Sequence, residues 1–283
     1  MLYRNRLVAL LDVLGISSKL CSPEKLEEIT EAYNMAVTEA RKLTDDPTPV
    51  DGSPNSPRPA FLYSHFVFDT IILVSHDPDP HGAKDFIFGV SLIMERLFER
   101  GMPVRGSIGH GAVYIPPDEG VVLSDQFKLL SKMELAQNWS GCAILPNAEE
   151  IVAESILGTS SSDFLANEPI RGCPILPYSV PLKATVDGDI SLRMCVNWVY
   201  GLEDGLVDEG VNRMAPAPEK QNHTQKFVQF VRGLKDEVVL LSEAQAPATR
   251  LHCIKARAGV RLLFRDDAGK AAEPSGSFTI SLG

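Results

Sequence analysis

The sequence of 283 residues has no run of about 18 apolar residues, the length that a helix needs to cross a bilayer. It is also short of basic residues. Its 27 Lys and Arg stand against 37 Asp and Glu, which gives a net charge of −10. Binding to the phosphates of a nucleic acid requires clustered Lys and Arg. We therefore expect a soluble protein that binds neither nucleic acid nor a membrane.

Cysteine is scarce, and no two cysteines are spaced as a CxxC pair. An odd number of five favours reduced thiols over a disulfide framework or a zinc site. The amino terminus has basic residues followed by an apolar run, as a signal peptide has. However, Asp12 lies inside that run and no small-residue cleavage site follows it. These features predict a cytoplasmic protein.

Patterns of two large enzyme classes are also missing. No serine lies in a G-x-S-x-G sequence, so a hydrolase of that type has no support. The glycines at 106, 109 and 111 do not form a dinucleotide-binding fingerprint, because no strand–turn–helix pattern surrounds them. Residues 45–59 contain five prolines and predict a long exposed loop.

The first half of the chain shows a regular order of elements. Apolar and amphipathic patterns predict strand, helix, strand, strand, helix and strand, at Arg6–Leu14, Ser22–Leu43, Phe61–Val67, Thr70–Val74, Asp85–Arg100 and Val104–Ile115. This is the order of the split βαβ, or ferredoxin-like, fold of the α+β class, in which one antiparallel sheet carries two helices on one face.

The rest of the chain is less regular. We expect helices at Gln126–Trp139, Ala148–Leu157 and Thr224–Leu241, and strands at Cys142–Leu145, Val180–Val186, Ser191–Val199, Val260–Phe264 and Ser277–Leu282. The predicted division is a catalytic core at 1–146 and a C-terminal α/β extension at 147–283 that packs on it.

Two aspartates lie in unusual surroundings. Asp12 interrupts the first apolar strand, and Asp69 lies between the two arms of the predicted hairpin. A buried carboxylate needs a cation, a metal or several donors. In the split βαβ plan the two residues can converge and share Mg²⁺ or Mn²⁺, which prefer hard oxygen ligands. The alternative is that both carboxylates only cap turns.

A short segment after Asp12 is suited to phosphate. Gly15-Ile16-Ser17-Ser18 runs from a strand end toward a helix N-terminus, where backbone N–H groups favour an anion. Farther along the chain, Arg105 lies in a strand among apolar neighbours and so requires an anionic partner. That partner is either a substrate phosphate or a structural carboxylate such as Glu134.

Three motifs in this order resemble the catalytic core of class III nucleotidyl cyclases. They are Leu11-Asp-Val-Leu-Gly-Ile16, Phe68-Asp69, and Val104-Arg-Gly-Ser-Ile-Gly-His-Gly-Ala-Val113. The chain is most similar to the bacterial Pycsar pyrimidine cyclases of anti-phage defence. Further motifs carry that likeness: Val67–Ile71, Arg105-Gly106, Met133–Gly141, Tyr178–Lys183 with Val196–Trp198, and Asn222–Thr224 before Phe227.

The resemblance implies a homodimer with two sites at its interface. Asp12 and Asp69, with the Ile16 carbonyl, would hold two Mn²⁺ or Mg²⁺ ions per site. These ions would grip the triphosphate and activate the ribose 3′-hydroxyl. Residues Gly15–Ser18 would bind the β- and γ-phosphates, and Arg105 would neutralise charge.

The resemblance also gives expectations for four further residues. Lys128 and Lys132 stand where many class III cyclases have a catalytic Asn and Arg, and the alternative is a solvated helix face. Tyr63 and His65 occupy the base-reading strand, and the alternative is a pair of half-buried sheet residues. The lysine that purine cyclases often have there is absent, which favours a pyrimidine.

The predicted function is therefore a uridylate cyclase, or less favourably a cytidylate cyclase. It would make a 3′,5′-cyclic second messenger that activates a separate effector in anti-phage defence. The alternatives are a purine cyclase, and a degenerate cyclase domain that binds a nucleotide or partner without turnover.

Overall fold

The structure is a computed structural model of the whole chain. It describes residues 1–16, 22–42, 59–76, 80–116, 122–166, 169, 172–183, 192–214, 216–234, 238–241, 261–265 and 271–272. Residues 45–58 of the predicted proline-rich loop and the predicted strand at 277–282 lie outside these residues. Among the described residues, no helix is long and apolar enough to cross a membrane.

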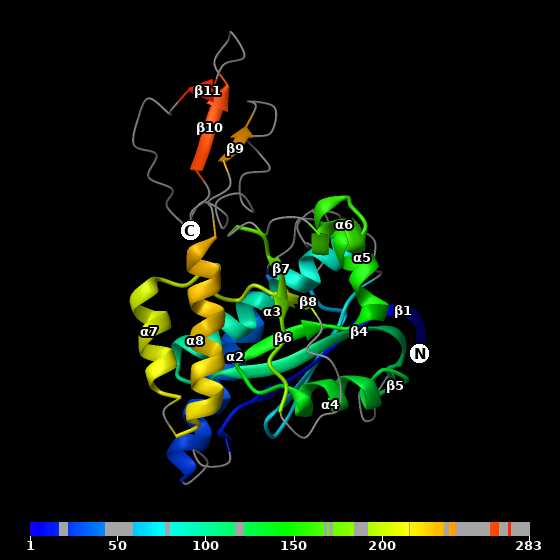
Figure 1. Cartoon of the computed structure of the whole chain (residues 1–283). Coiled ribbons are helices and arrows are strands. Elements are labelled where there is room, and N and C mark those ends of the chain that lie inside the picture. The colour runs from blue at the N-terminus through cyan, green and yellow to red at the C-terminus, as the bar shows by residue number, and fades with distance from the viewer. Residues whose placement is uncertain are drawn as a thin grey trace.

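The first six elements form the predicted split βαβ unit. They are β1 (Leu2–Val13), α2 (Pro23–Arg41), β2 (Tyr63–Val67), β3 (Thr70–Val74), α3 (Pro80–Glu99) and β4 (Val104–Tyr114). Their strands lie in the order β2-β3-β1-β4, and each strand is antiparallel to its neighbours. This order confirms the ferredoxin-like expectation and the α+β class (Figure 1).

The same sheet continues beyond the unit. The further elements are β5 (Leu123–Ser124), α4 (Phe127–Ala136), β6 (Gly141–Ile144), α5 (Pro146–Leu157), α6 (Ser161–Ala166), β7 (Ile175–Ser179), β8 (Leu192–Val196), α7 (Asp204–Asn212) and α8 (Pro218–Gly233). Strand β6 is parallel to β4, and β8 and β7 extend the sheet past β6. The division at residue 146 stays a prediction, and β8 and β7 share the sheet of the first half.

Two of the predicted elements need correction. The first arm of the C-terminal hairpin is β7, which ends at Ser179 instead of spanning Val180–Val186, because the backbone of Pro181 and Lys183 is hydrogen-bonded to Asn138 and Ala136 instead. Helix α8 ends at Gly233 rather than at 241, and Val238–Leu241 is strand β9. Strands β9, β10 (Arg261–Arg265) and β11 (Ala271–Ala272) form a separate three-stranded sheet. The sequence did not predict β5, α6, α7 or β11.

The start of α2 follows from its sequence. The Ser22 side chain accepts a hydrogen bond from the Lys25 backbone N–H at 3.4 Å, and Pro23 occupies the first turn. The helix then buries one face, which includes Ile29, Tyr33 and Ala36, against the main core. The predicted N-cap is thereby confirmed.

The large sheet has two unlike faces. Alternate residues of β1, such as Leu7, Ala9 and Leu11, are fully buried in the main core with residues of α2 and α3. The opposite face carries Val8, Leu10 and Asp12. There, helix α4 covers β1 and β4 over a small second core (Figure 1). The candidate site residues therefore belong to the face on which α4 lies.

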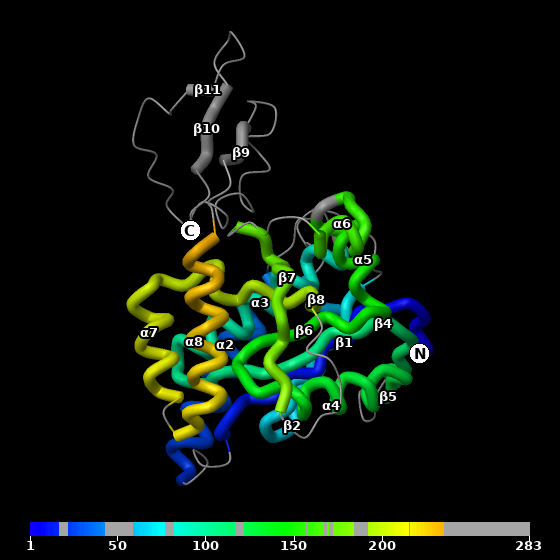
Figure 2. Tube along the Cα trace, in the orientation of Figure 1, coloured from blue at the N-terminus to red at the C-terminus, as the bar shows by residue number. Residues whose placement is uncertain are grey.

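Aromatic side chains join the C-terminal segments to the sheet. The ring of Trp139 stacks on Tyr178 at 5.2 Å and meets Phe227 edge-on at 4.9 Å. These three residues come from the segment before β6, from β7 and from α8, which lies beside α7 (Figure 2). The aromatic residues of the C-terminal motifs thus form part of the core.

Strand β4 requires glycine at position 106, because the backbone of β1 passes close to it. A Cβ atom at Gly106 would lie 2.4 Å from the Leu11 side chain and 2.7 Å from the Leu10 carbonyl oxygen. A real Cβ atom does not approach other atoms so closely, and the clash is with the backbone of the central strand. Gly106 therefore allows β4 to pair with β1 beside Asp12.

We predict that Gly106→Ala lowers the free energy of unfolding by about 1–3 kcal/mol, because the added methyl group overpacks the strand pair. Gly205→Ala in α7 is the matched control. No atom lies within 4 Å of its added Cβ, so we expect a gain of about 0.5–1 kcal/mol from reduced chain entropy. Urea denaturation measures both. A Gly106→Ala protein as stable as the parent would contradict the packing argument.

Candidate active site

The structure brings Asp12 and Asp69 together. Asp12 lies opposite Thr70 of β3 in the strand register, and the Val13 backbone N–H donates to the Asp69 carbonyl at 2.9 Å. Burial raises the pKa of Asp12, Arg105 lowers it, and the negative charge of Asp69 raises it further. The two carboxylates are therefore close enough to repel each other.

Asp69 is held by a tight turn between β2 and β3. Phe68, the residue before it, has a backbone φ of +60°, which bulky residues rarely adopt, and its ring is 60% exposed. The Thr70 hydroxyl donates to the Asp69 carboxylate at 3.3 Å. An unusual backbone conformation is thus maintained next to a candidate ligand, as is common at functional sites.

Arg105 lies in β4 directly opposite Asp12 and connects three groups. Its Nη2 is 2.9 Å from Asp12 Oδ2 and also forms an ion pair with Glu134 of α4. Its Nη1 donates to the Gln137 carbonyl at 3.2 Å. Arg105 is only 5% exposed, so these carboxylates compensate a buried positive charge. The structural ion pair with Glu134 is present, and Asp12 shares it.

Burial is the largest cause of the pKa shifts of Asp12 and Glu134, the two carboxylates that pair with Arg105. The pKa of Glu134 is raised to about 6, mainly by burial. Arg105 lowers this pKa, and the charge of Asp12 contributes to raising it. Glu134 is therefore partly protonated near that pH, and a shared proton between two carboxyls relieves their repulsion.

The phosphate-binding segment is described only in part. Gly15 has a φ of +76°, which glycine adopts without strain, and the Ile16 side chain is fully buried. The Leu14 backbone N–H donates to the Pro103 carbonyl at 2.8 Å, so the segment is anchored beside the start of β4. Ser17 and Ser18 lie outside the described residues.

The two candidate base-binding residues lie on the same sheet face as Asp12. In the strand register His65 pairs with Ile72, and Ile72 pairs with Leu10. Leu10 precedes Asp12 by two residues, so it lies on the same face of β1. His65 is exposed, and its ring lies 5.9 Å from the Tyr63 ring. Tyr63 is buried in the small core under α4, so His65 is the residue of this pair that faces solvent.

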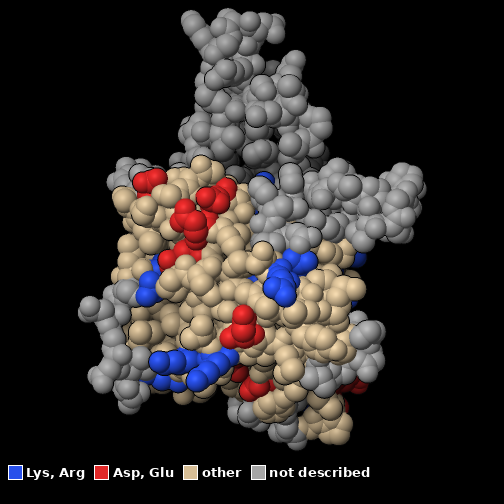
Figure 3. Space-filling model, turned by 90° about the vertical axis from the view of Figure 1, so that its right-hand side faces the viewer, with Lys and Arg blue, Asp and Glu red and all other residues tan. Residues whose placement is uncertain are grey.

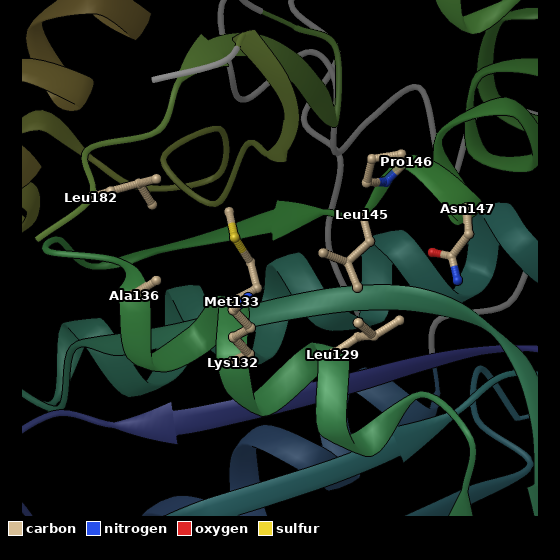
Figure 4. A pocket seen from close by; sticks show the side chains of 8 residues that line it. All are labelled: Leu129, Lys132, Met133, Ala136, Leu145, Pro146, Asn147 and Leu182. Carbon is tan, nitrogen blue, oxygen red and sulfur yellow. The ribbon is translucent and has the colours of Figure 1, made fainter. Parts of the chain in front are cut away.

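Lys128 and Lys132 do not reach Asp12 within one chain. Both are exposed on α4. Glu134, which does face Arg105, follows Lys132 by two residues, or about 200° around the helix. Lys132 instead lines an apolar cavity of about 400 Å³ with Leu129, Met133, Leu145 and Leu182 (Figure 4). Any action of these lysines on a site of this kind requires a second chain.

Three residues near the site were missed by the sequence analysis. The buried Tyr33 hydroxyl of α2 has no hydrogen-bond partner among the described residues, and burial and then the charges of Asp69 and Asp12 raise its pKa. Lys220 of α8 lies close enough to Arg105 and Lys183 that their positive charges, after burial, lower its pKa. No pattern marks Tyr33 or Lys220, and the motif that ends at Lys183 gave that lysine no role, because only the tertiary fold brings these segments to the site.

The donor set fits a divalent cation. Two adjacent carboxylates offer hard oxygen ligands, and a doubly charged ion would relieve the repulsion that raises the pKa of Asp12. Within the described ranges, no group of three or more His, Cys, Asp or Glu could hold a metal. Backbone oxygens, water or a ligand would therefore have to complete the coordination.

Comparisons with known proteins give the following findings. No protein-family model matches the chain, and no curated protein matches it. Two solved structures are similar to it at 12% identity: the catalytic core of a rhodopsin-guanylyl cyclase with converted specificity in complex with ATPαS, and the guanylyl cyclase Cya2. The first has a TM-score of 0.42 and covers 69% of this chain and 96% of that chain. The second has a TM-score of 0.38, with 68% and 90% covered.

The raised pKa of Glu134 predicts a pH-dependent stability. Between pH 4.5, its ordinary pKa, and about 6, the folded protein binds more protons than the unfolded chain, so this group makes stability fall as pH rises. Glu134→Gln removes the titration. In metal-free buffer, we expect the unfolding free energy of the parent to fall relative to that of Glu134→Gln across this window. A constant difference between the two proteins would show that Glu134 titrates normally.

Proposed function

We propose that the protein is a nucleotide cyclase. It would convert a nucleoside triphosphate to the 3′,5′-cyclic monophosphate and pyrophosphate, using Mg²⁺ or Mn²⁺. The observation that carries the proposal is that Asp12 and Asp69 lie together at one end of the sheet face that carries α4, with Arg105 in contact with Asp12. Carboxylates suit the cations, and the guanidinium suits phosphate.

Each group of site residues would have a separate role in this reaction. Asp12 and Asp69 would hold two divalent ions, which supply positive charge to the phosphates and lower the pKa of the ribose hydroxyl. The backbone at Gly15 and Ile16 would bind the terminal phosphates. Arg105, fixed in place by Glu134 and Gln137, would stabilise charge that develops on the phosphate oxygens. The ribose 3′-oxygen forms the new bond to the α-phosphorus as pyrophosphate leaves.

The substrate we propose is a pyrimidine nucleotide, UTP in preference to CTP. His65 is exposed on the face of Asp12, at the place where the resemblance assigns base reading, and its ring can stack on or hydrogen-bond a base. No lysine stands at this position. A purine substrate on the same scaffold is the alternative.

A homodimer would complete the site. The outer side of α4 carries Leu129 and Leu135, which are each more than half exposed, together with Lys128 and Lys132. On the side shown in Figure 3, acidic groups gather toward the upper left of the described surface and basic groups lie lower. The two lysines point away from Asp12 of their own chain, so we propose that they act at the partner's site.

A second candidate function is nucleotide binding without turnover. The pairing of Asp12 with Arg105 favours it, because a metal must compete with a buried guanidinium. Lysines in place of the usual Asn and Arg favour it too. Nucleotide binding that depends on metal but gives no product would distinguish this function from a cyclase.

The biological role that we propose rests on the resemblance alone. The cyclic nucleotide would be a second messenger in anti-phage defence, read by a separate effector protein. We place the protein in the cytoplasm, and its Cys142 and Cys195 are free and buried in the structure.

Asp69→Ala should abolish pyrophosphate release from the nucleotide, a loss of at least about 10³-fold, because one of two metal-binding carboxylates is removed. Asp69 is half-buried and forms no ion pair within the described segments, so folding should survive. Glu27→Ala on the exposed side of α2 is the control and should retain parental activity. Full activity in Asp69→Ala would refute the metal assignment.

Mixing two inactive variants tests the shared site. If Lys132 acts on the partner's site, Lys132→Ala and Asp69→Ala should each be inactive alone. Random re-association then gives half heterodimers with one intact site each, and about a quarter of the parental activity returns. No recovery from a mixture shown to exchange subunits would mean that Lys132 does not act at the partner's site. Activity in Lys132→Ala alone would mean that Lys132 is not needed for the reaction.

A further inference from the structure

The segment that contains Lys183 runs along the end of α4. The Lys183 backbone N–H donates to the Ala136 carbonyl at 2.8 Å, and the Asn138 N–H donates to the Pro181 carbonyl at 2.9 Å. Leu182 forms an isolated β-bridge with Gln137. The backbone of residues 181–183 is therefore fixed beside the turn at 137–140, which we call the α4–β6 turn.

Helix α8 meets the same turn from another direction. A ring nitrogen of His223 lies 2.9 Å from the Asn138 carbonyl, and the Ser140 backbone N–H donates to the Thr224 hydroxyl at 2.8 Å. Lys220 precedes these two residues by three and four positions, so it lies on the same face of α8. The hydroxyl of Thr224 also donates to the Lys220 carbonyl at 2.8 Å. Lys220 is thus on the side of α8 that faces the α4–β6 turn.

Arg105 of β4 also contacts this turn, because its Nη1 donates a hydrogen bond to the Gln137 carbonyl. The electrostatics agree with this geometry. Burial lowers the pKa of Lys220, and the positive charges of Arg105 and Lys183 lower it further, whereas Asp12 and Glu134 raise it. The positive charges of Arg105 and Lys183, which come from two other segments of the chain, therefore act on Lys220 beside the two acidic partners of Arg105.

The two lysines differ from Arg105 in their partners. Arg105 pairs with Asp12 and Glu134, whereas neither Lys183 nor Lys220 forms an ion pair with a described residue. Both lysines are partly exposed, so a ligand can reach them. Grouped cations repel each other, and a bound anion between them would remove that cost. The Nε of Arg105 also lacks a hydrogen-bond partner in the described part of the chain.

We propose that Lys183 and Lys220, supplied by the C-terminal half of the chain, form with Arg105 a binding site for the polyphosphate of the nucleotide. The identification of the anion rests on the proposed function. A polyphosphate carries several charges over a length that can span more than one cation, and it can lie against metal-bearing Asp12 at one end. The C-terminal half would then be part of the active site and would hold the pyrophosphate that is released.

The direct test is the binding of inorganic pyrophosphate, measured by calorimetry on the full chain with and without Mg²⁺. Lys220→Met and Lys183→Met keep most of the alkyl chain and remove the charge. We expect each to weaken binding by about ten-fold or more, the usual effect of losing one charge-assisted hydrogen bond. Lys220→Arg should restore most of the affinity. Lys226→Met, an exposed lysine farther along α8, should bind as the parent does.

The outcomes separate this proposal from the proposed function. Equal pyrophosphate affinity in the parent, Lys220→Met and Lys183→Met overturns the site, even if the protein turns nucleotides over. Absence of pyrophosphate binding in the parent overturns it as well. Lysine-dependent binding in a protein that releases no product from any nucleotide supports the site and refutes the cyclase. Melting temperatures within a few degrees of the parent's would show that the variants are folded.

Discussion

The buried positive charge of Arg105 is the constraint around which the candidate site is built. A guanidinium in the middle of a sheet must be compensated, and here Asp12 from the neighbouring strand and Glu134 from the overlying helix do so. The ion pair between Arg105 and Glu134 holds α4 against β4, and the ion pair with Asp12 compensates the charge of that carboxylate. Gly106, adjacent to Arg105, permits the close strand pairing that brings the groups together.

The C-terminal half of the chain completes the sheet and also lies beside the candidate site. Strands β8 and β7 continue the sheet, and Trp139, Tyr178 and Phe227 pack across the junction. The α4–β6 turn donates a hydrogen bond to the Pro181 carbonyl, accepts one from Arg105 and is hydrogen-bonded to α8. The segments that complete the fold therefore also lie next to the residues that would bind phosphate.

The sequence predicted well where local signals and the global fold agree. The Ser22 cap, the apolar strands and their order were sufficient for the split βαβ unit, and that topology placed Asp12 near Asp69. It failed where tertiary contacts override local pattern. The apolar stripe of α8 continues past Gly233, but the helix does not. Lys183 and Lys220 could not be predicted as neighbours, because nearly forty residues of chain separate them and no motif pairs them.

The most direct test of the central claim is to identify the product. The purified protein is incubated separately with UTP, CTP, ATP and GTP and with Mn²⁺, and the products are resolved by mass spectrometry. The account predicts one 3′,5′-cyclic pyrimidine nucleotide with an equal amount of pyrophosphate. A cyclic purine would keep the chemistry and contradict the role given to His65. Absence of a cyclic product from all four nucleotides, with metal-dependent nucleotide binding intact, would contradict the account and leave a binding domain.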